Sequence, residues 1–135
     1  AQLVSALAPT GAFQRVCLQQ ALREPDLAWW RAQPAGSVHW YGEQLQDFAD
    51  TAALCAAMDL VISVDTSVAH LAAALGQTTW ILLPHVPDWR WQMQGSQSPW
   101  YDAVRLYRQG EDSGWPALLQ SVSEDLQRCV LAAQR

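Results

Sequence analysis

The strongest constraint on the fold of this chain is a pair of short apolar runs that flank a helical pattern. Residues 60–64 (LVISV) are rich in β-branched side chains and too few for a helix, which is typical of a strand covered on both faces. Apolar residues then recur at helical spacing over 68–75, and Gly76 is suited to end that helix. Residues 78–83 form the second strand-like run. The expected apolar stripe of the helix consists of Val68, Leu71, Ala72 and Leu75.

Alternating strands and helices are expected along the rest of the chain as well. A strand–helix–strand unit of this length implies parallel strands with helices packed on the sheet. We therefore predict an α/β fold, a Rossmann-like parallel sheet with helices on both faces, in a single domain over residues 1–135. The other expected elements are a helix at 2–8, strands at 13–19, 37–41 and 104–107, an ambiguous segment at 23–36, a helix from residue 48 capped by Asp47, and a long final helix that opens at Trp115-Pro116.

The composition argues against several classes of function. The formal net charge is −5 and all eight basic residues are arginines, so the chain lacks the basic surface that nucleic acids or anionic membranes require. No apolar run approaches the roughly 18 residues of a membrane span, and the N-terminus shows no signal-peptide pattern. The cysteines are scattered and the histidines dispersed, which favours reduced thiols and no metal site. We expect a cytoplasmic protein with no transmembrane segment.

The turn between the first buried strand and its helix is the first candidate site. In an open parallel sheet, ligands bind beyond the carboxyl ends of the strands. Free backbone amides at the start of the helix favour an anion such as phosphate, and Thr66 and Ser67 add hydroxyl groups there. His70 lies one turn later on the same side. The alternative is that Asp65 or Thr66 merely caps the helix and that His70 is a surface histidine.

The irregular segment after the second buried strand is the other candidate. Residues 84–91 (PHVPDWRW) and 98–101 (SPWY) leave the sheet at the same edge, so they are expected to overhang the same crevice. Arg90 between two indoles is suited to hold a phosphate or carboxylate, and Trp89 and Trp91 to stack on a base or sugar. The alternative is a long loop that packs its own aromatic side chains to stay ordered.

A family resemblance joins these two segments. Residues 65–76 (DTSVAHLAAALG) resemble the D-[TS]-[GSA]-x-x-H-L-A-x-A-L-G signature of the heptosyltransferase-type glycosyltransferases, family nine. Residues 47–54 (DFADTAAL), 59–65 (DLVISVD) and 87–91 (PDWRW) are similar to bacterial proteins in which tetratricopeptide repeats precede such a domain. The resemblance runs from about residue 45 to residue 115.

The resemblance implies the C-terminal, donor-binding half of a GT-B glycosyltransferase that is inverting and independent of metals. The substrate is then a nucleotide sugar, with no further cofactor. By position Asp65 would contact the donor sugar or ribose, while Thr66, Ser67 and His70 would hold the diphosphate. The family usually has glycine where this chain has Ser67. Activity is implied for the full-length protein and not for these 135 residues alone.

Several parts of the implied enzyme are expected outside this chain. A first strand with a basic phosphate-binding loop, the acceptor domain and its catalytic base would lie upstream of Ala1, together with tetratricopeptide repeats. The acceptor is unknown. One alternative is a degenerate, non-catalytic transferase-like module that serves interactions beside the repeats. A second alternative is a sugar epimerase of related architecture, although the additional carboxylates of such enzymes are not found here.

Overall fold

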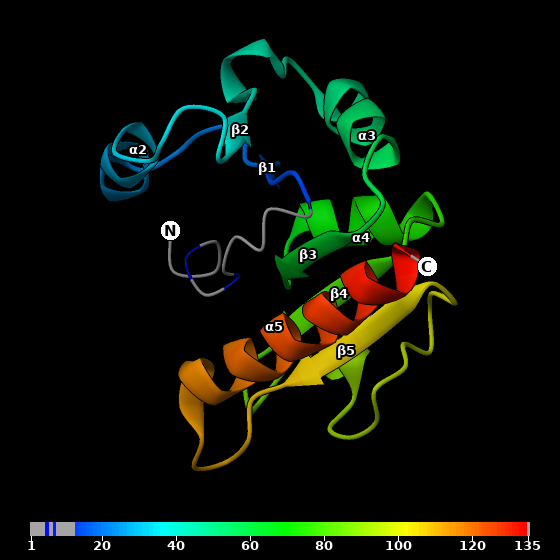
Figure 1. Cartoon of the computed structure of the whole chain (residues 1–135). Coiled ribbons are helices and arrows are strands. Elements are labelled where there is room, and N and C mark those ends of the chain that lie inside the picture. The colour runs from blue at the N-terminus through cyan, green and yellow to red at the C-terminus, as the bar shows by residue number, and fades with distance from the viewer. Residues whose placement is uncertain (1–4, 6, 8–12, 135) are drawn as a thin grey trace. The chain divides into compact units, whose positions relative to one another are not determined.

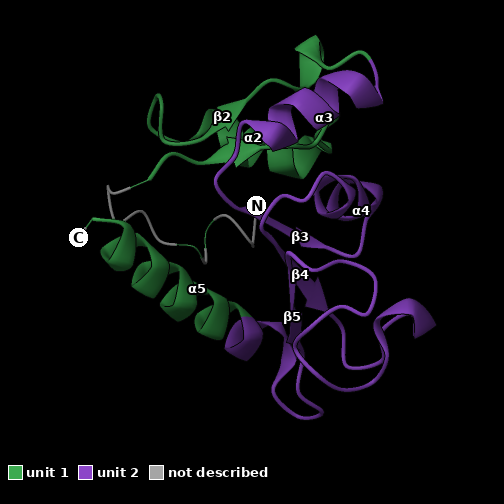
Figure 2. Ribbon diagram, turned by 90° about the vertical axis from the view of Figure 1, so that its right-hand side faces the viewer, with its two compact units in different colours: residues 1–46, 119–135 green, residues 47–118 purple. Residues whose placement is uncertain are grey.

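A computed structural model describes residues 5, 7 and 13–134. The helix expected over 2–8 lies almost wholly outside the described residues. The chain divides into two compact units (Figure 2), residues 1–46 with 119–135 and residues 47–118. Each unit is described by itself, and the expected single domain stays a prediction. No helix of the described part is long and apolar enough to cross a membrane.

The first unit contains a small parallel pair of strands. β1 (Val16–Cys17) pairs with β2 (His39–Trp40), so both expected strands are confirmed in shorter form. The ambiguous segment between them forms α2 (Glu24–Arg31), because a proline in its first turn and two acidic residues there favour a helix start. A short 3₁₀ turn, η1 (Gly42–Gln44), follows β2.

Tryptophan side chains tie the first unit together. The Trp30 and Trp40 rings meet edge to face with centroids 5.3 Å apart. Their indole N–H groups donate to the carbonyls of Val38 and Gln19, at 3.1 and 2.8 Å. Gly42 is required beside them, because a Cβ at that position would overlap the Trp40 indole.

The second unit is a three-stranded parallel sheet in the order β3-β4-β5, with all three strands where the sequence predicts them (Figure 1). All five residues of β4 are buried, as expected for a central strand. The described strands thus form two separate parallel sheets, where the sequence predicts one. The α/β, Rossmann-like character is confirmed. The elements of this unit are α3 (Phe48–Ala56), β3 (Val61–Val64), α4 (Ser67–Ala74), β4 (Thr79–Leu83), the 3₁₀ turn η2 (Trp89–Trp91) and β5 (Val104–Arg108); α5 (Gly114–Ala133) begins here and continues in the first unit.

α3 is closed by side chains at both ends. As predicted, Asp47 caps its start: one carboxylate oxygen accepts from the amides of Ala49 and Asp50, at 2.8 and 3.0 Å. At the other end the Gln77 amide donates to the carbonyls of Cys55 and Met58, at 2.8 and 2.6 Å. The Gln77 side chain thus adds hydrogen bonds to carbonyls at and just beyond the end of the helix.

The buried face of α4 agrees with the predicted stripe at Ala72 and differs from it elsewhere. Ala69, Ala72 and Ala73 are buried, whereas Leu75 is 48% exposed. Alanine lets the helix axis approach the sheet closely, so the small residues and not the larger ones face β4. Gly76, with φ of +77°, ends the helix as predicted.

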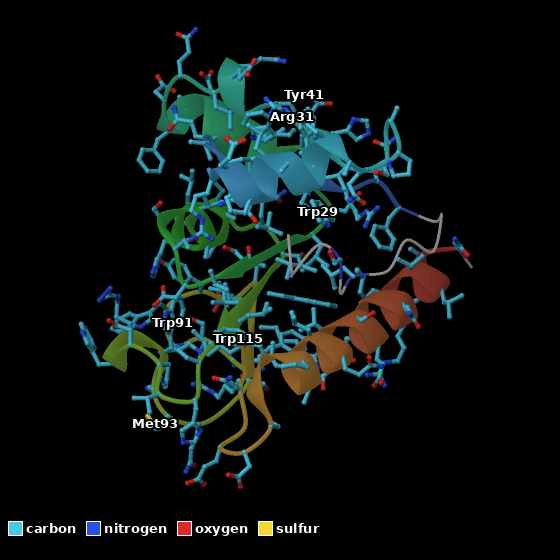
Figure 3. The ribbon with its side chains drawn as sticks, turned by 90° about the vertical axis from the view of Figure 1, so that its left-hand side faces the viewer. Trp29, Arg31, Tyr41, Trp91, Met93 and Trp115 are labelled. Carbon is cyan, nitrogen blue, oxygen red and sulfur yellow. The ribbon has the colours of Figure 1, made fainter. Side chains whose placement is uncertain are left out.

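The loop between β4 and β5 completes the core on the same face of the sheet. Trp91 is fully buried, whereas Met93 two residues later is 59% exposed at the outer edge of the loop (Figure 3). The Arg108 guanidinium donates to four loop carbonyls, of residues 91, 92, 94 and 95, at 2.5 to 3.2 Å. The core cluster consists of Ala69, Ala73, Ile81, Leu83, Trp91, Val104 and Leu106.

We expect Trp91→Ala to lower the free energy of unfolding by about 3–5 kcal/mol, because it empties the centre of this core. Trp89→Ala is the matched control: that side chain is 74% exposed, so its removal should cost no more than about 0.5 kcal/mol. Trp91→Phe should cost less than Trp91→Ala, partly because the buried Trp91 indole N–H has no hydrogen-bond partner among the described residues. Urea unfolding measures all three, and equal losses at 89 and 91 would contradict the assignment of Trp91 to the core.

Arg108→Lys should loosen the loop although it keeps the charge. An ammonium group lacks the fork of donors that reaches several carbonyls at once, so we expect a loss of about 1.5–3 kcal/mol. Faster proteolytic cleavage within residues 92–97 should accompany it. Arg31→Lys, at an exposed position of α2, is the control. An unchanged cleavage rate in Arg108→Lys would mean that the loop is held by other contacts.

Candidate functional site

The turn from β3 into α4 leaves the first amides of the helix without a side-chain cap. Thr66 holds the N-cap position with extended backbone (φ −144°, ψ 167°), yet its side chain makes no capping hydrogen bond. Its hydroxyl lies 3.1 Å from the Ser63 hydroxyl, which donates to the Val64 carbonyl at 2.9 Å. Since a hydroxyl has one proton, Thr66 donates to Ser63. No side chain therefore caps the first amides of the helix, and those of Ser67, which is exposed, and Val68, which is half-buried, can bind an anion.

His70 lies between two side chains from other segments. Its Nδ1 is 3.1 Å from the Tyr101 hydroxyl, and its Nε2 is 3.3 Å from a carboxylate oxygen of Asp65. The buried Trp91 ring stacks on the imidazole with centroids 5.0 Å apart. The ring is thus fixed on three sides, and its side chain is 30% exposed.

A hollow of about 640 Å³ opens beside His70. Two tryptophans of its wall are well exposed, Trp89 at 74% and Trp100 at 58%. The Arg90 guanidinium lies over the Trp89 ring at 5.6 Å and forms an ion pair with Asp88 at 3.2 Å. The hollow therefore combines flat apolar rings with a cation, which suits a ligand that carries both a ring and a negative charge. Its walls are His70, Trp89, Arg90, Trp100 and Tyr101.

Short-range hydrogen bonds fix the backbone that carries these aromatic side chains. The Ser98 hydroxyl accepts from the amides of Trp100 and Tyr101, at 3.1 and 3.3 Å. The Asp88 carboxylate accepts from the Arg90 amide at 3.1 Å, and the Trp100 indole donates to the Arg90 carbonyl at 2.7 Å. The exposed rings are consequently held in place by a bonded loop.

The structure brings together most of the residues that the sequence singles out. Asp65 and His70 are in contact, and Trp89 and Arg90 share the hollow with His70. The prediction for Trp91 is wrong. This residue is expected to stack on a ligand, but its side chain is fully buried and packs on His70 from the core side. An apolar ring next to a sheet gains more from burial there than from exposure in the hollow.

Tyr101 and Trp100 have no role assigned to them by the sequence. Both lie within the segment that is expected to overhang the crevice, and the Ser98-Pro99 pair before them is a turn signal. Their contacts with His70 and Arg90 join positions 31 and 10 residues apart. The spacing of residues along the sequence does not predict contacts between such distant positions.

The residues around the turn are similar to those of a known enzyme family. Residues 45–82 match the family model of glycosyltransferase family 9 (heptosyltransferase). This heptosyltransferase match contains α3, β3, the turn and α4, and it confirms the resemblance over that segment. It supports a glycosyltransferase-like function.

A curated protein is similar to part of the chain. Protein FlbA of Caulobacter vibrioides is 34% identical over 80 residues, which cover 59% of this chain and 13% of that protein. The match thus spans a small part of the relative's length. No solved structure matches the chain. Across the described residues, no three His, Cys, Asp or Glu side chains gather into a metal-ligand cluster, and metal independence stays a prediction.

Proposed function

We propose that the turn 65–67 and the start of α4 bind the diphosphate of a nucleotide-sugar donor, in an inverting, metal-independent GT-B glycosyltransferase. The observation that carries the proposal is the uncapped start of α4 inside the segment that matches the heptosyltransferase family. α3 in the same unit has its start closed by Asp47, whereas the starts of α4 and of α2 have no side-chain cap. Open amides and the helix dipole both favour a diphosphate.

The proposed reaction is a displacement at the anomeric carbon of the donor sugar. An acceptor hydroxyl forms the new bond to that carbon, and the bond from the carbon to the diphosphate oxygen breaks. The electron pair of that bond leaves with the nucleoside diphosphate, and the acceptor proton passes to a base outside this chain. The amides of Ser67 and Val68 stabilise the charge that develops on the leaving diphosphate, an electrostatic role without a covalent step.

The hollow beside the turn is the proposed place for the rings of the donor. Trp89 and Trp100 present exposed faces on which a nucleobase or sugar can stack. The charge of Arg90 favours an anionic ligand, although Asp88 offsets part of it. Asp65 remains the residue proposed to contact a hydroxyl group of the donor sugar or ribose. In this proposal the acceptor and its binding residues belong to parts of the protein outside this site.

Ser67→Pro tests the amide site without removing a side chain that packs. Proline is favoured at the first position of a helix, and the extended backbone of Thr66 is the conformation that a residue before proline adopts. The change removes one N–H, so we expect nucleoside-diphosphate affinity to fall about ten- to a hundred-fold with the melting temperature preserved. Calorimetric titration with ADP, GDP and UDP measures it.

Ser67→Ala is the matched control, since it removes the hydroxyl and keeps the amide. A smaller loss than in Ser67→Pro is expected. Equal affinity of wild type and Ser67→Pro would contradict an amide-bound diphosphate. If none of the three diphosphates binds the wild-type chain, the proposal is overturned and the non-catalytic interaction module is favoured.

A further inference from the structure

The two ring nitrogens of His70 face groups of different chemistry. Nε2 faces the Asp65 carboxylate at 3.3 Å, and Nδ1 faces the Tyr101 hydroxyl at 3.1 Å. Asp65 precedes α4, His70 lies within it, and Tyr101 comes from the loop before β5. The Trp91 ring stacked on the imidazole fixes this orientation. Three segments thus form one chain of contacts that ends at the hollow.

The protons of this chain of contacts can be assigned by counting donors. A bare Nε2 would set its lone pair against a carboxylate, so Nε2 carries a proton. In the neutral imidazole Nδ1 is then bare and accepts the single proton of the Tyr101 hydroxyl. In the charged imidazolium Nδ1 also carries a proton and donates to the Tyr101 oxygen. Only in this second state is the proton of the tyrosine free for another acceptor.

We propose that Tyr101 is a further ligand-binding residue, whose hydroxyl donates to a diphosphate oxygen of the donor once protonated His70 has turned it toward the hollow. His70 is then its positioning residue. The inference rests on the proposed function, because it needs an anion at this place. Tyr101 and His70 both line the hollow. When the Tyr101 hydroxyl proton is not hydrogen-bonded to His70, it can therefore point into space that a ligand can fill.

The charged groups around the imidazole set the direction of this coupling. The Asp65 carboxylate faces the imidazole, and a bound diphosphate adds a second negative group beside it. Arg90 in the same hollow carries the opposite charge, which Asp88 partly offsets at 3.2 Å. The side chains of the core cluster beside α4 carry no charge. Binding should therefore be accompanied by uptake of a proton and should weaken as the pH rises through the range, about 5 to 8, in which histidines titrate.

The test compares wild type and Tyr101→Phe at pH 5.5 and pH 8.5 by calorimetric titration. UDP-glucose and ADP-glucose are the probes, because a doubly esterified diphosphate has no ionisation of its own in this range, unlike a terminal phosphate. We expect Tyr101→Phe to lose about ten-fold in affinity at pH 5.5. It should lose almost nothing at pH 8.5, where the Tyr101 hydroxyl of the wild type donates its hydrogen bond to neutral His70. A role in packing alone would weaken binding equally at both pH values.

His70→Asn and Tyr41→Phe complete the design. Asn at position 70 has an amide that does not titrate, so the affinity of His70→Asn should no longer depend on pH. Tyr41, in the first unit, is the matched control and should change nothing at either pH. A loss in Tyr101→Phe that is equal at both pH values, or absent at both, overturns this inference and leaves the proposed function standing. If neither probe binds the wild type at either pH, both are overturned.

Discussion

The Arg108 guanidinium bonds to four carbonyls of the loop between β4 and β5, and the middle of the loop that carries the candidate site depends on these bonds. Arg108 lies opposite Leu83 in the sheet, on the face that also carries the core cluster. Burial lowers the pKa of Arg108, but a guanidinium titrates so far above neutrality that it keeps its charge. Charge-assisted bonds therefore fold a loop without regular structure onto the sheet.

The aromatic side chains of the folded loop lie in different surroundings. Trp91 enters the core and meets His70 from that side, while Tyr101 meets the same imidazole through a hydrogen bond. Trp89 and Trp100 stay exposed at the rim of the hollow. Exposed large apolar side chains are commonly a sign of binding when their backbone is fixed, because a loop that needed them only for order would bury them. The two exposed indoles, and not the buried one, are therefore accessible to a ligand.

The sequence predicts the elements of this fold well and the contacts between them poorly. The apolar runs at 60–64 and 78–83 and the Asp47 cap act locally, so spacing and residue type are enough to find them. The buried face of α4 is predicted correctly only at Ala72, because the packing of the helix on the sheet buries its alanines and leaves Leu75 exposed. Likewise Arg108 bonds to backbone atoms 13 to 17 residues away, and no pattern of side-chain types marks a carbonyl as an acceptor.

The start of α4 shows how the candidate site departs from what stability alone would favour. A capping side chain is worth about 0.5–2 kcal/mol, and Thr66 has a hydroxyl at the position where a cap belongs. That hydroxyl instead donates to Ser63, so the helix forgoes its cap and keeps its amides open. Asp65, the other side chain near enough to cap, is turned toward His70. The side chains of Thr66 and Asp65 both have other partners, and this missing cap is what makes the start of α4 the candidate site for an anion.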